Sequence, residues 1–186
     1  RNKNTQNKFY FANSQLMRTL ILSSSLSVES KSYLLCRKTY KILTEKVDCK
    51  LFDARSISLR AFHNETTEGM KKLKQEIKNS DNIIIGMGVH CYSINDSLKI
   101  ILDNCFEEAE GKFFGILCAA GGEKSYLATQ HLSQICMNEW RMIQLPRIVY
   151  ATTKDFKKDK INSIETENRI KLFAEEFYII GGKLLN

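Results

Sequence analysis

The sequence alternates five times between a short apolar segment and a longer segment whose apolar residues follow helical spacing. The apolar segments span residues 17–23, 49–54, 82–86, 112–119 and 142–151. Residues 20–22 and 83–85 are apolar at every position, which is typical of strands buried on both faces of a parallel sheet. The helical segments lie near residues 30–47, 66–79, 94–109, 125–138 and 162–184. The alternation predicts an α/β fold in which a five-stranded parallel sheet carries helices on both faces.

The order of the strands follows from the handedness of their connections. Right-handed crossovers leave few topologies for five strands, and the common one is the flavodoxin-like order 2-1-3-4-5. In that order a ligand binds beyond the carboxyl ends of strands 1, 3 and 4. Residues 23–32, 86–93 and 119–124 follow these ends, so we expect the functional site there. Pro146 lies inside the fifth segment and predicts a bulge or an edge strand, because proline cannot donate to a neighbouring strand.

Length and charge predict one domain that is preceded by a basic tail. We expect residues 1–15 to form a flexible tail and residues 16–186 to form a single domain. The net charge is +7, but residues 1–18 carry four cations and no acid. The folded part is therefore only mildly basic, and we expect no nucleic-acid partner.

The cysteines predict a reducing environment. None of the six lies closer than 13 positions to the next, as the spacing of residues 36, 49, 91, 105, 118 and 136 shows. This spacing fits neither a zinc site nor a redox pair, so we expect no metal and a cytoplasmic location. No apolar run approaches the length of a membrane span, and we expect no membrane association.

The three loops suit three parts of one ligand. The first is rich in serine and precedes a helix, and hydroxyls beside a helix N-terminus can hold a phosphate. The second carries His90 and Tyr92, whose flat side chains suit the face of a planar ring. The third contains Gly121 and Gly122, which let the edge of a ligand approach backbone N–H groups. A dinucleotide fingerprint and a Walker A motif are both absent. Phosphate, ring face and ring edge together describe FMN.

From about residue 18 to residue 160 the chain resembles the NAD(P)H-dependent FMN reductase family of flavodoxin-like proteins. The strongest match is the segment 82–103. In it an apolar strand and a short loop precede three residue pairs typical of the family, namely Ser93-Ile94, Leu98-Lys99 and Leu102-Asp103. The second match is Ala119-Ala120-Gly121-Gly122 together with Leu127 and Gln130-His131-Leu132, which resemble the Gly-rich loop and the following helix of the family. The first loop departs from the family, because Ser24 stands in place of a glycine and Ser27 in place of an arginine. Residues 87–90 depart as well, since the family has Thr-Pro-x-Tyr there.

The resemblance implies which residues contact the cofactor. Three serines would hold the phosphate: Ser25, Ser30 and Ser32. The flavin ring would be lined by His90, Cys91 and Tyr92. Its polar edge would lie along Gly121, Gly122, Glu123 and Lys124. No catalytic acid or base is implied, because hydride transfer to a flavin depends on stacked geometry more than on proton transfer.

Two functions are consistent with these residues. In the first, NADPH or NADH reduces bound FMN, which passes electrons to free flavin, a quinone or another small acceptor, and the chain forms a homodimer or homotetramer. In the second, a flavodoxin-like module without reductase activity senses a ligand or binds a partner. The substitutions at Ser24 and Ser27 motivate the second function.

Overall fold

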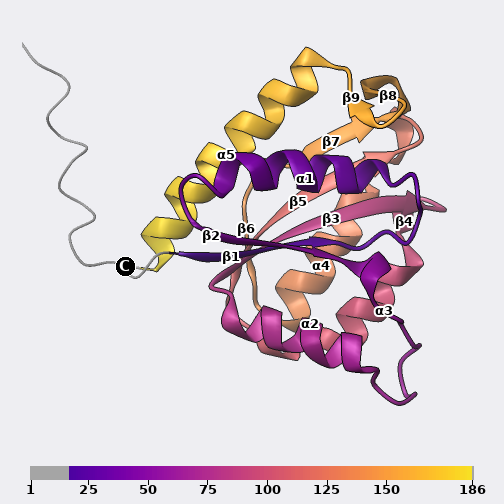
Figure 1. Cartoon of the computed structure of the whole chain (residues 1–186), viewed down its shortest axis with the longest axis vertical. Coiled ribbons are helices and arrows are strands. Elements are labelled where there is room, and N and C mark those ends of the chain that lie inside the picture. Colours follow the sequence, from indigo (N-terminus) through magenta and orange to yellow (C-terminus); the bar gives the residue numbers. More distant parts are fainter. Residues whose placement is uncertain (1–16, 186) are drawn as a thin grey trace, which may run out of the picture.

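A parallel sheet forms the middle layer of the molecule (Figure 1). The computed structural model describes residues 17–185, so the predicted tail at residues 1–15 lies outside the described part. The sheet follows the order β2-β1-β3-β5, and both β6 and β7 pair with the outer side of β5. These strands are β1 (Arg18–Ser23), β2 (Asp48–Asp53), β3 (Asn82–His90), β5 (Phe113–Ala120), β6 (Ile143–Gln144) and β7 (Val149–Thr152). The predicted fold class and strand order are confirmed.

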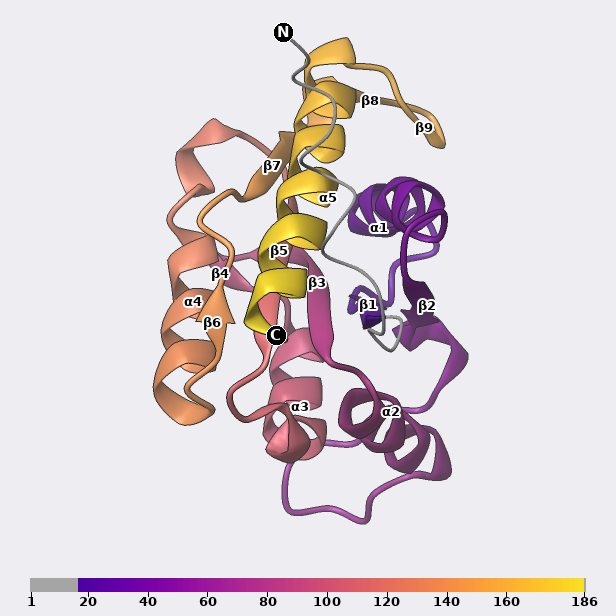
Figure 2. The same ribbon diagram turned by 90° about the vertical axis from the view of Figure 1, so that its left-hand side faces the viewer.

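Within residues 17–185, five α-helices cover the two faces of the sheet (Figure 2). One face carries α1 (Lys31–Leu43) and α5 (Ile164–Leu184), and the other carries α2 (Glu68–Asn79), α3 (Asp96–Cys105) and α4 (Ala128–Glu139). Short 3-10 turns lie in the connections at η1 (Ala54–Ser56), η2 (Glu107–Ala109), η3 (Glu123–Ser125) and η4 (Thr153–Asp155). Ser30 caps α1, and its side chain accepts a hydrogen bond from the Tyr33 N–H.

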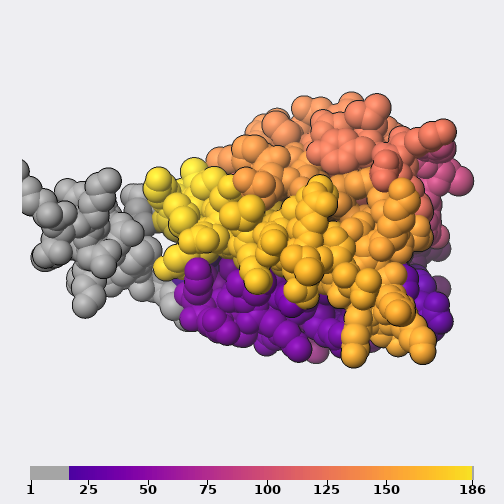
Figure 3. Space-filling view, turned by 90° about the horizontal axis from the view of Figure 1, so that it is seen from above, coloured from indigo at the N-terminus to yellow at the C-terminus, as the bar shows by residue number. Residues whose placement is uncertain are grey.

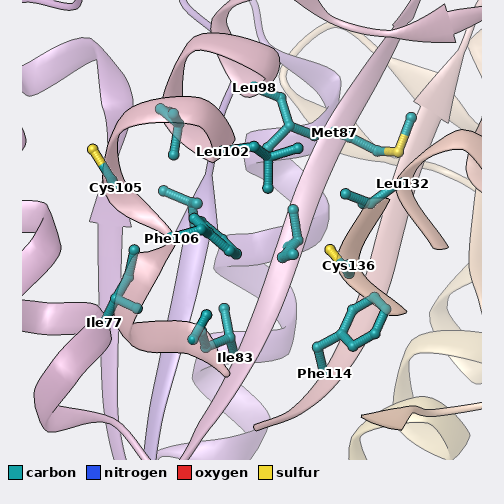
Figure 4. Close-up of a cluster of buried hydrophobic side chains, with 14 of the residues drawn as sticks. Ile77, Ile83, Met87, Leu98, Leu102, Cys105, Phe106, Phe114, Leu132 and Cys136 are labelled. Atoms are coloured by element: carbon teal, nitrogen blue, oxygen red, sulfur yellow. The ribbon is translucent and has the colours of Figure 1, made fainter. Parts of the chain in front are cut away.

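The central strands are apolar on both faces because they separate two hydrophobic cores. Ile83 and Ile85 belong to the core under α2, α3 and α4, whereas Ile84 between them belongs to the core under α1 and α5. Figure 4 shows the first of these cores, where Phe106 lies among side chains from the sheet and from α3. On the second face α1 passes so close to β3 that a Cβ at Gly86 would lie 2.1 Å from Cys36 Sγ.

Two predicted segments have a different structure. Residues 87–90, predicted as a loop, continue β3 to His90 and turn back into β4 (Ser93–Ile94), with which β3 pairs antiparallel. The strand continues because β5 extends to Ala120 and offers pairing partners as far as Gly88. Residues 142–151, predicted as one strand, divide into β6 and β7 on either side of Pro146. Both pieces lie at the edge of the sheet, which confirms the prediction from this proline.

A small hairpin between the last strand and the last helix was not predicted. It consists of β8 (Phe156–Lys157) and β9 (Lys160–Ile161), which pair antiparallel. Among residues 17–185, none of the helices has both the length and the apolar character that crossing a membrane requires. Within the same residues, no three His, Cys, Asp or Glu side chains gather as they would around a metal ion.

Candidate functional site

Three connections meet at the carboxyl-terminal edge of the sheet, on the right in Figure 1. They are the loop at residues 24–30 after β1, the hairpin formed by β3 and β4, and the loop at residues 121–127 after β5. They are neighbours because β3 pairs in parallel with both β1 and β5. This is the edge at which open α/β sheets bind their ligands.

The first loop presents hydroxyl groups at the start of α1. Ser30 and Ser32 are buried, and their hydroxyl oxygens lie 3.1 Å apart. Ser25 is half-buried, and its hydroxyl accepts a hydrogen bond from the Ser27 N–H at 3.3 Å. The first turn of α1 contains no acid, so no side chain there opposes the positive end of the helix dipole. This end of the loop can accept an anion.

Arg55, which sequence reasoning missed, supports the first loop from the end of β2. Its Nη1 donates to the Val28 carbonyl oxygen at 3.1 Å, and its guanidinium lies 4.3 Å from the centre of the Tyr33 ring. Its Nε donates to both carboxylate oxygens of Asp53 at 3.0 Å. The hydrogen bond to Asp53 raises the pKa of Arg55, so the guanidinium stays charged. Arg55 therefore places a fixed cation beside a loop in which Ser27 replaces the arginine of the family.

Asn95 connects the first loop to β3. Its Oδ1 accepts a hydrogen bond from the Gly88 N–H at 3.0 Å, and its Nδ2 donates to Ser97 Oγ at 2.8 Å. Ser24 Oγ lies 3.2 Å from Asn95 Oδ1 and 2.7 Å from the Gly86 carbonyl oxygen. Asn95 is 1% exposed. Its position before a helix is a capping signal in sequence, but its side chain makes no capping bond to α3 and joins two loops instead.

The hairpin turn holds two of the predicted ring contacts in an uncommon backbone conformation. Cys91 has a φ of 48° and Tyr92 a φ of 61°. This is the left-handed region, which side chains other than Gly, Asn and Asp rarely occupy and which costs on the order of 1 kcal/mol or more per residue. His90 Nδ1 lies 3.5 Å from an Asp96 carboxylate oxygen. From α4, His131 Nδ1 lies 3.0 Å from Ser93 Oγ and helps to hold the hairpin.

The third loop is oriented by hydrogen bonds to two of its carbonyl groups. Thr153 Oγ1 donates to the Gly121 carbonyl oxygen at 3.0 Å, and the Tyr150 hydroxyl donates to that of Gly122 at 2.6 Å. Because C=O and N–H point in opposite directions across a trans peptide, the N–H groups of Gly122 and Glu123 point away from Tyr150 and Thr153. Within residues 17–185 neither N–H has a partner. A Cβ at Gly121 or Gly122 would meet no atom within 4 Å, so a ligand can reach this backbone.

Tyr150 was not identified from the sequence, although it determines how the third loop is oriented. Its ring packs edge-on against Tyr126 with the ring centres 5.1 Å apart, and its hydroxyl lies 3.1 Å from Ser125 Oγ. Burial raises the pKa of Tyr150, so the hydroxyl keeps the proton that it donates to Gly122.

A cavity of about 390 Å³ joins the hairpin to the third loop. It is lined by Tyr92, Gly121, Gly122, Glu123, Lys124, Ser125, Thr152 and Lys154. Lys154 Nζ lies 3.2 Å from a Glu123 carboxylate oxygen. The structure thus brings together Tyr92 and all four residues predicted at the ring edge. The other predicted contacts lie outside this cavity, namely Ser25, Ser30, Ser32, His90 and Cys91.

The sequence matches the model of the NADPH-dependent FMN reductase family over residues 17–157. No curated protein matches the chain significantly. Among solved structures, an oxidoreductase from Corynebacterium diphtheriae has 18% identity and a TM-score of 0.71, over 91% of this chain and 99% of that one. The flavoenzyme NAD(P)H:(acceptor) oxidoreductase from Paracoccus denitrificans has 15% identity and a TM-score of 0.75, over 90% and 98%. An NADH:FMN oxidoreductase in its apo form has 15% identity and a TM-score of 0.74, over 88% and 89%. At these identities the likeness concerns the fold.

Proposed function

The chain belongs to the family of NADPH-dependent FMN reductases, and from this premise we propose that it binds FMN at the carboxyl-terminal edge of its sheet. With NADPH or NADH as reductant, it passes electrons to free flavin, a quinone or another small acceptor. Bound FMN supplies the two-electron chemistry. The protein binds and orients the ring, and it excludes water from one side of it.

The observation that carries this proposal is the lining of the cavity between the hairpin and the third loop. Tyr92 contributes an aromatic ring to the lining, and Gly122 and Glu123 contribute backbone N–H groups that have no partner among residues 17–185. A flavin ring needs both, because its face is apolar and its pyrimidine edge accepts hydrogen bonds. Fixed donors at that edge also stabilise the negative charge that the ring gains on reduction.

At the other end of the cofactor, we propose that Ser25, Ser30 and Ser32 hold the phosphate at the start of α1. Support comes from the helix N-terminus, which carries no acid in its first turn. Arg55 adds support, since it fixes the loop through the Val28 carbonyl. We also propose that His90 and Cys91 contact the flavin ring.

Residues 16–186 form one FMN-binding domain in this proposal, and the chain assembles into a homodimer or homotetramer. Light scattering on the purified protein measures the second point directly. A mass that corresponds to two or four chains is expected, and the mass of a single chain would contradict it.

A glycine substitution tests the location of the site. Gly121→Val places a side chain where the ring edge would lie, and the backbone tolerates it because its Cβ position is open. We expect FMN affinity to fall by at least about tenfold, or about 1.4 kcal/mol, in a titration of flavin fluorescence. Gly182→Val is the matched control, because its Cβ position is equally open and it lies near the end of α5. Equal FMN affinity in both variants would show that the site lies elsewhere.

A further inference from the structure

The positive charge of the described chain is concentrated on two segments. They are α1 and residues 154–160, and the second segment contains the β8–β9 hairpin except for Ile161. We call the combined surface of the two segments the basic face. It holds eight cations and two acids, a net charge of +6, whereas the other residues of 17–185 hold 17 cations and 19 acids, a net charge of −2. Within α1 itself there are four cations and no acid.

The two segments form one continuous surface. Lys31 Nζ donates to the Lys158 carbonyl oxygen at 3.0 Å and lies 6.0 Å from the centre of the Phe156 ring. A groove of about 200 Å³ separates α1 from β9, and Arg37, Lys41 and Lys160 are among the residues that line it. Figure 3 shows the hairpin and α5 lying against α1.

Most charges on this face are not neutralised. Five exposed side chains have no carboxylate within salt-bridge distance among residues 17–185: Arg37, Lys41, Lys157, Lys158 and Lys160. Lys38 does pair with Glu167, at 2.8 Å. Elsewhere ion pairs are common, as between Lys50 and Glu76 and between Arg147 and Glu176. Unneutralised like charges repel one another in the free protein, and a negatively charged partner removes this cost.

The basic face borders the candidate site on two sides. Lys31 directly follows Ser30 of the first loop, and Lys154 lines the cavity. A partner that docks on this face therefore comes to lie beside the place where electrons would leave the protein.

We propose that the basic face docks an acidic redox protein that carries single electrons. This inference rests on the proposed function for its source of electrons. NADPH yields NADP⁺, one proton and two electrons, so one turnover reduces two partner molecules, for example two Fe³⁺ centres to Fe²⁺. Complementary charge would steer the acidic partner to the cavity and raise its association rate.

A protein fits this surface better than a lipid membrane or a nucleic acid. None of the exposed large apolar side chains of residues 17–185 lies in α1 or in residues 153–161, whereas membrane-surface segments bury such side chains in the lipid. Single-stranded nucleic acids stack on exposed aromatic rings, but Phe156 is half-buried beneath Lys31.

An acidic rubredoxin serves as the probe. Its NADPH-dependent reduction is followed by absorbance, and its binding by calorimetry without NADPH. For the wild-type protein we expect kcat/KM for rubredoxin to fall steeply as salt is added. The variant R37E/K41E/K160E should lose at least about tenfold in kcat/KM and in affinity at low salt, together with most of the salt dependence.

The matched control is R60E/K72E/K183E, which changes the net charge equally at exposed cations outside the basic face. It should stay within about twofold of the wild type in kcat/KM for rubredoxin, by the additivity of distant sites.

Menadione, a small uncharged acceptor, should be reduced equally by all three proteins. If the wild-type protein binds rubredoxin in calorimetry but does not reduce menadione, the result counts against the proposed function and not against the docking. The docking proposal is overturned if rubredoxin does not bind or if both variants bind it equally. Two further probes are vesicles of phosphatidylcholine and phosphatidylserine and a single-stranded oligonucleotide. The proposal is also overturned if R37E/K41E/K160E weakens the binding of either of these probes but not the binding of rubredoxin.

Discussion

Tyr150 shows how a single hydroxyl can orient a binding loop. Tyr150→Phe removes the hydrogen bond to Gly122 and keeps the ring against Tyr126. We expect the Glu123 N–H to lose its fixed direction, so that FMN binds several-fold more weakly and its midpoint potential becomes more negative. The stability cost should be about 1 kcal/mol. Flavin titration and potentiometry measure the two effects, with Tyr40→Phe on α1 as the control. Equal potentials in the two variants would contradict this role.

Asn95 should matter for stability as well as for binding. Asn95→Ala leaves the half-buried Gly88 N–H without its partner and removes the buried contacts of Asn95 with Ser24 and Ser97, which costs about 1–3 kcal/mol. Thermal unfolding should therefore begin at a lower temperature than in Asn138→Ala, since Asn138 is exposed. FMN affinity should fall too, because the first loop and β3 lose their connection. A Tm equal to that of Asn138→Ala would show that the connection is unimportant.

The glycines of the candidate site were easier to predict from the sequence than the residues that orient its loops. Gly121 and Gly122 stand out because two adjacent residues without side chains follow a strand. Tyr150 and Asn95 do not stand out, because each acts on a loop far away in the chain: Tyr150 lies 28 positions from Gly122, and Asn95 lies 71 from Ser24. Only the folded sheet brings these residues together.

Among the elements, the β3–β4 hairpin combines strain with function. Two-residue hairpin turns favour Asn-Gly, because both positions need a positive φ, whereas this turn has Cys91 and Tyr92. The double variant C91N/Y92G relieves this strain at both positions, which the greater unfolded-state entropy of glycine offsets in part. It should therefore stabilise the fold by about 1 kcal/mol and weaken FMN binding, since Tyr92 lines the cavity. Thermal unfolding and flavin titration measure the two effects. If stability does not rise, the turn carries no strain.

The η4 turn should make stability depend on pH through Asp155. Burial alone would raise the pKa of this carboxyl, but hydrogen bonds from the Thr152 N–H and the Thr166 hydroxyl outweigh burial and lower it. Because the folded pKa lies below the unfolded value of about 3.9, the stabilisation is complete above that value and is lost as the pH falls through the lowered pKa. Asp155→Asn should therefore cost about 1–2 kcal/mol at pH 7 and progressively less as the pH falls below about 3.9 and through the lowered pKa. A difference between the two proteins that is constant with pH would contradict this.

The β3 extension and the β8–β9 hairpin were not predicted because their residues do not have a strand-like pattern. The β3 extension at residues 87–90 follows Gly86 and contains Gly88. Glycines favour a loop in sequence, but both are paired with β5 in the sheet. The β8–β9 hairpin is mostly charged, so it lacks the apolar alternation by which strands are recognised. In both cases the neighbouring segments determine the structure more than the local residues do.

At the scale of the whole molecule, the fold was predictable because its central strands are buried on both faces. A continuous apolar run such as residues 83–85 is stable only between two helical layers. Five short strand segments separated by amphipathic helices leave few arrangements. The position of the site follows from the fold, since it requires only the ends of β1, β3 and β5. Charge did not reveal the basic face, because the cations of α1 and of residues 154–160 are brought together only by folding.

In the proposed function, the cavity at the sheet edge binds FMN, and NAD(P)H reduces it there. The most direct measurement is the visible absorption spectrum of the purified protein with added FMN, followed by NADPH and, separately, NADH under anaerobic conditions. We predict a flavin spectrum that stays with the protein through gel filtration and is bleached by at least one of the two reductants. A protein that emerges colourless after incubation with FMN does not bind FMN tightly, and one that keeps its flavin spectrum with both reductants is not an NAD(P)H-dependent reductase; either result would overturn the proposed function.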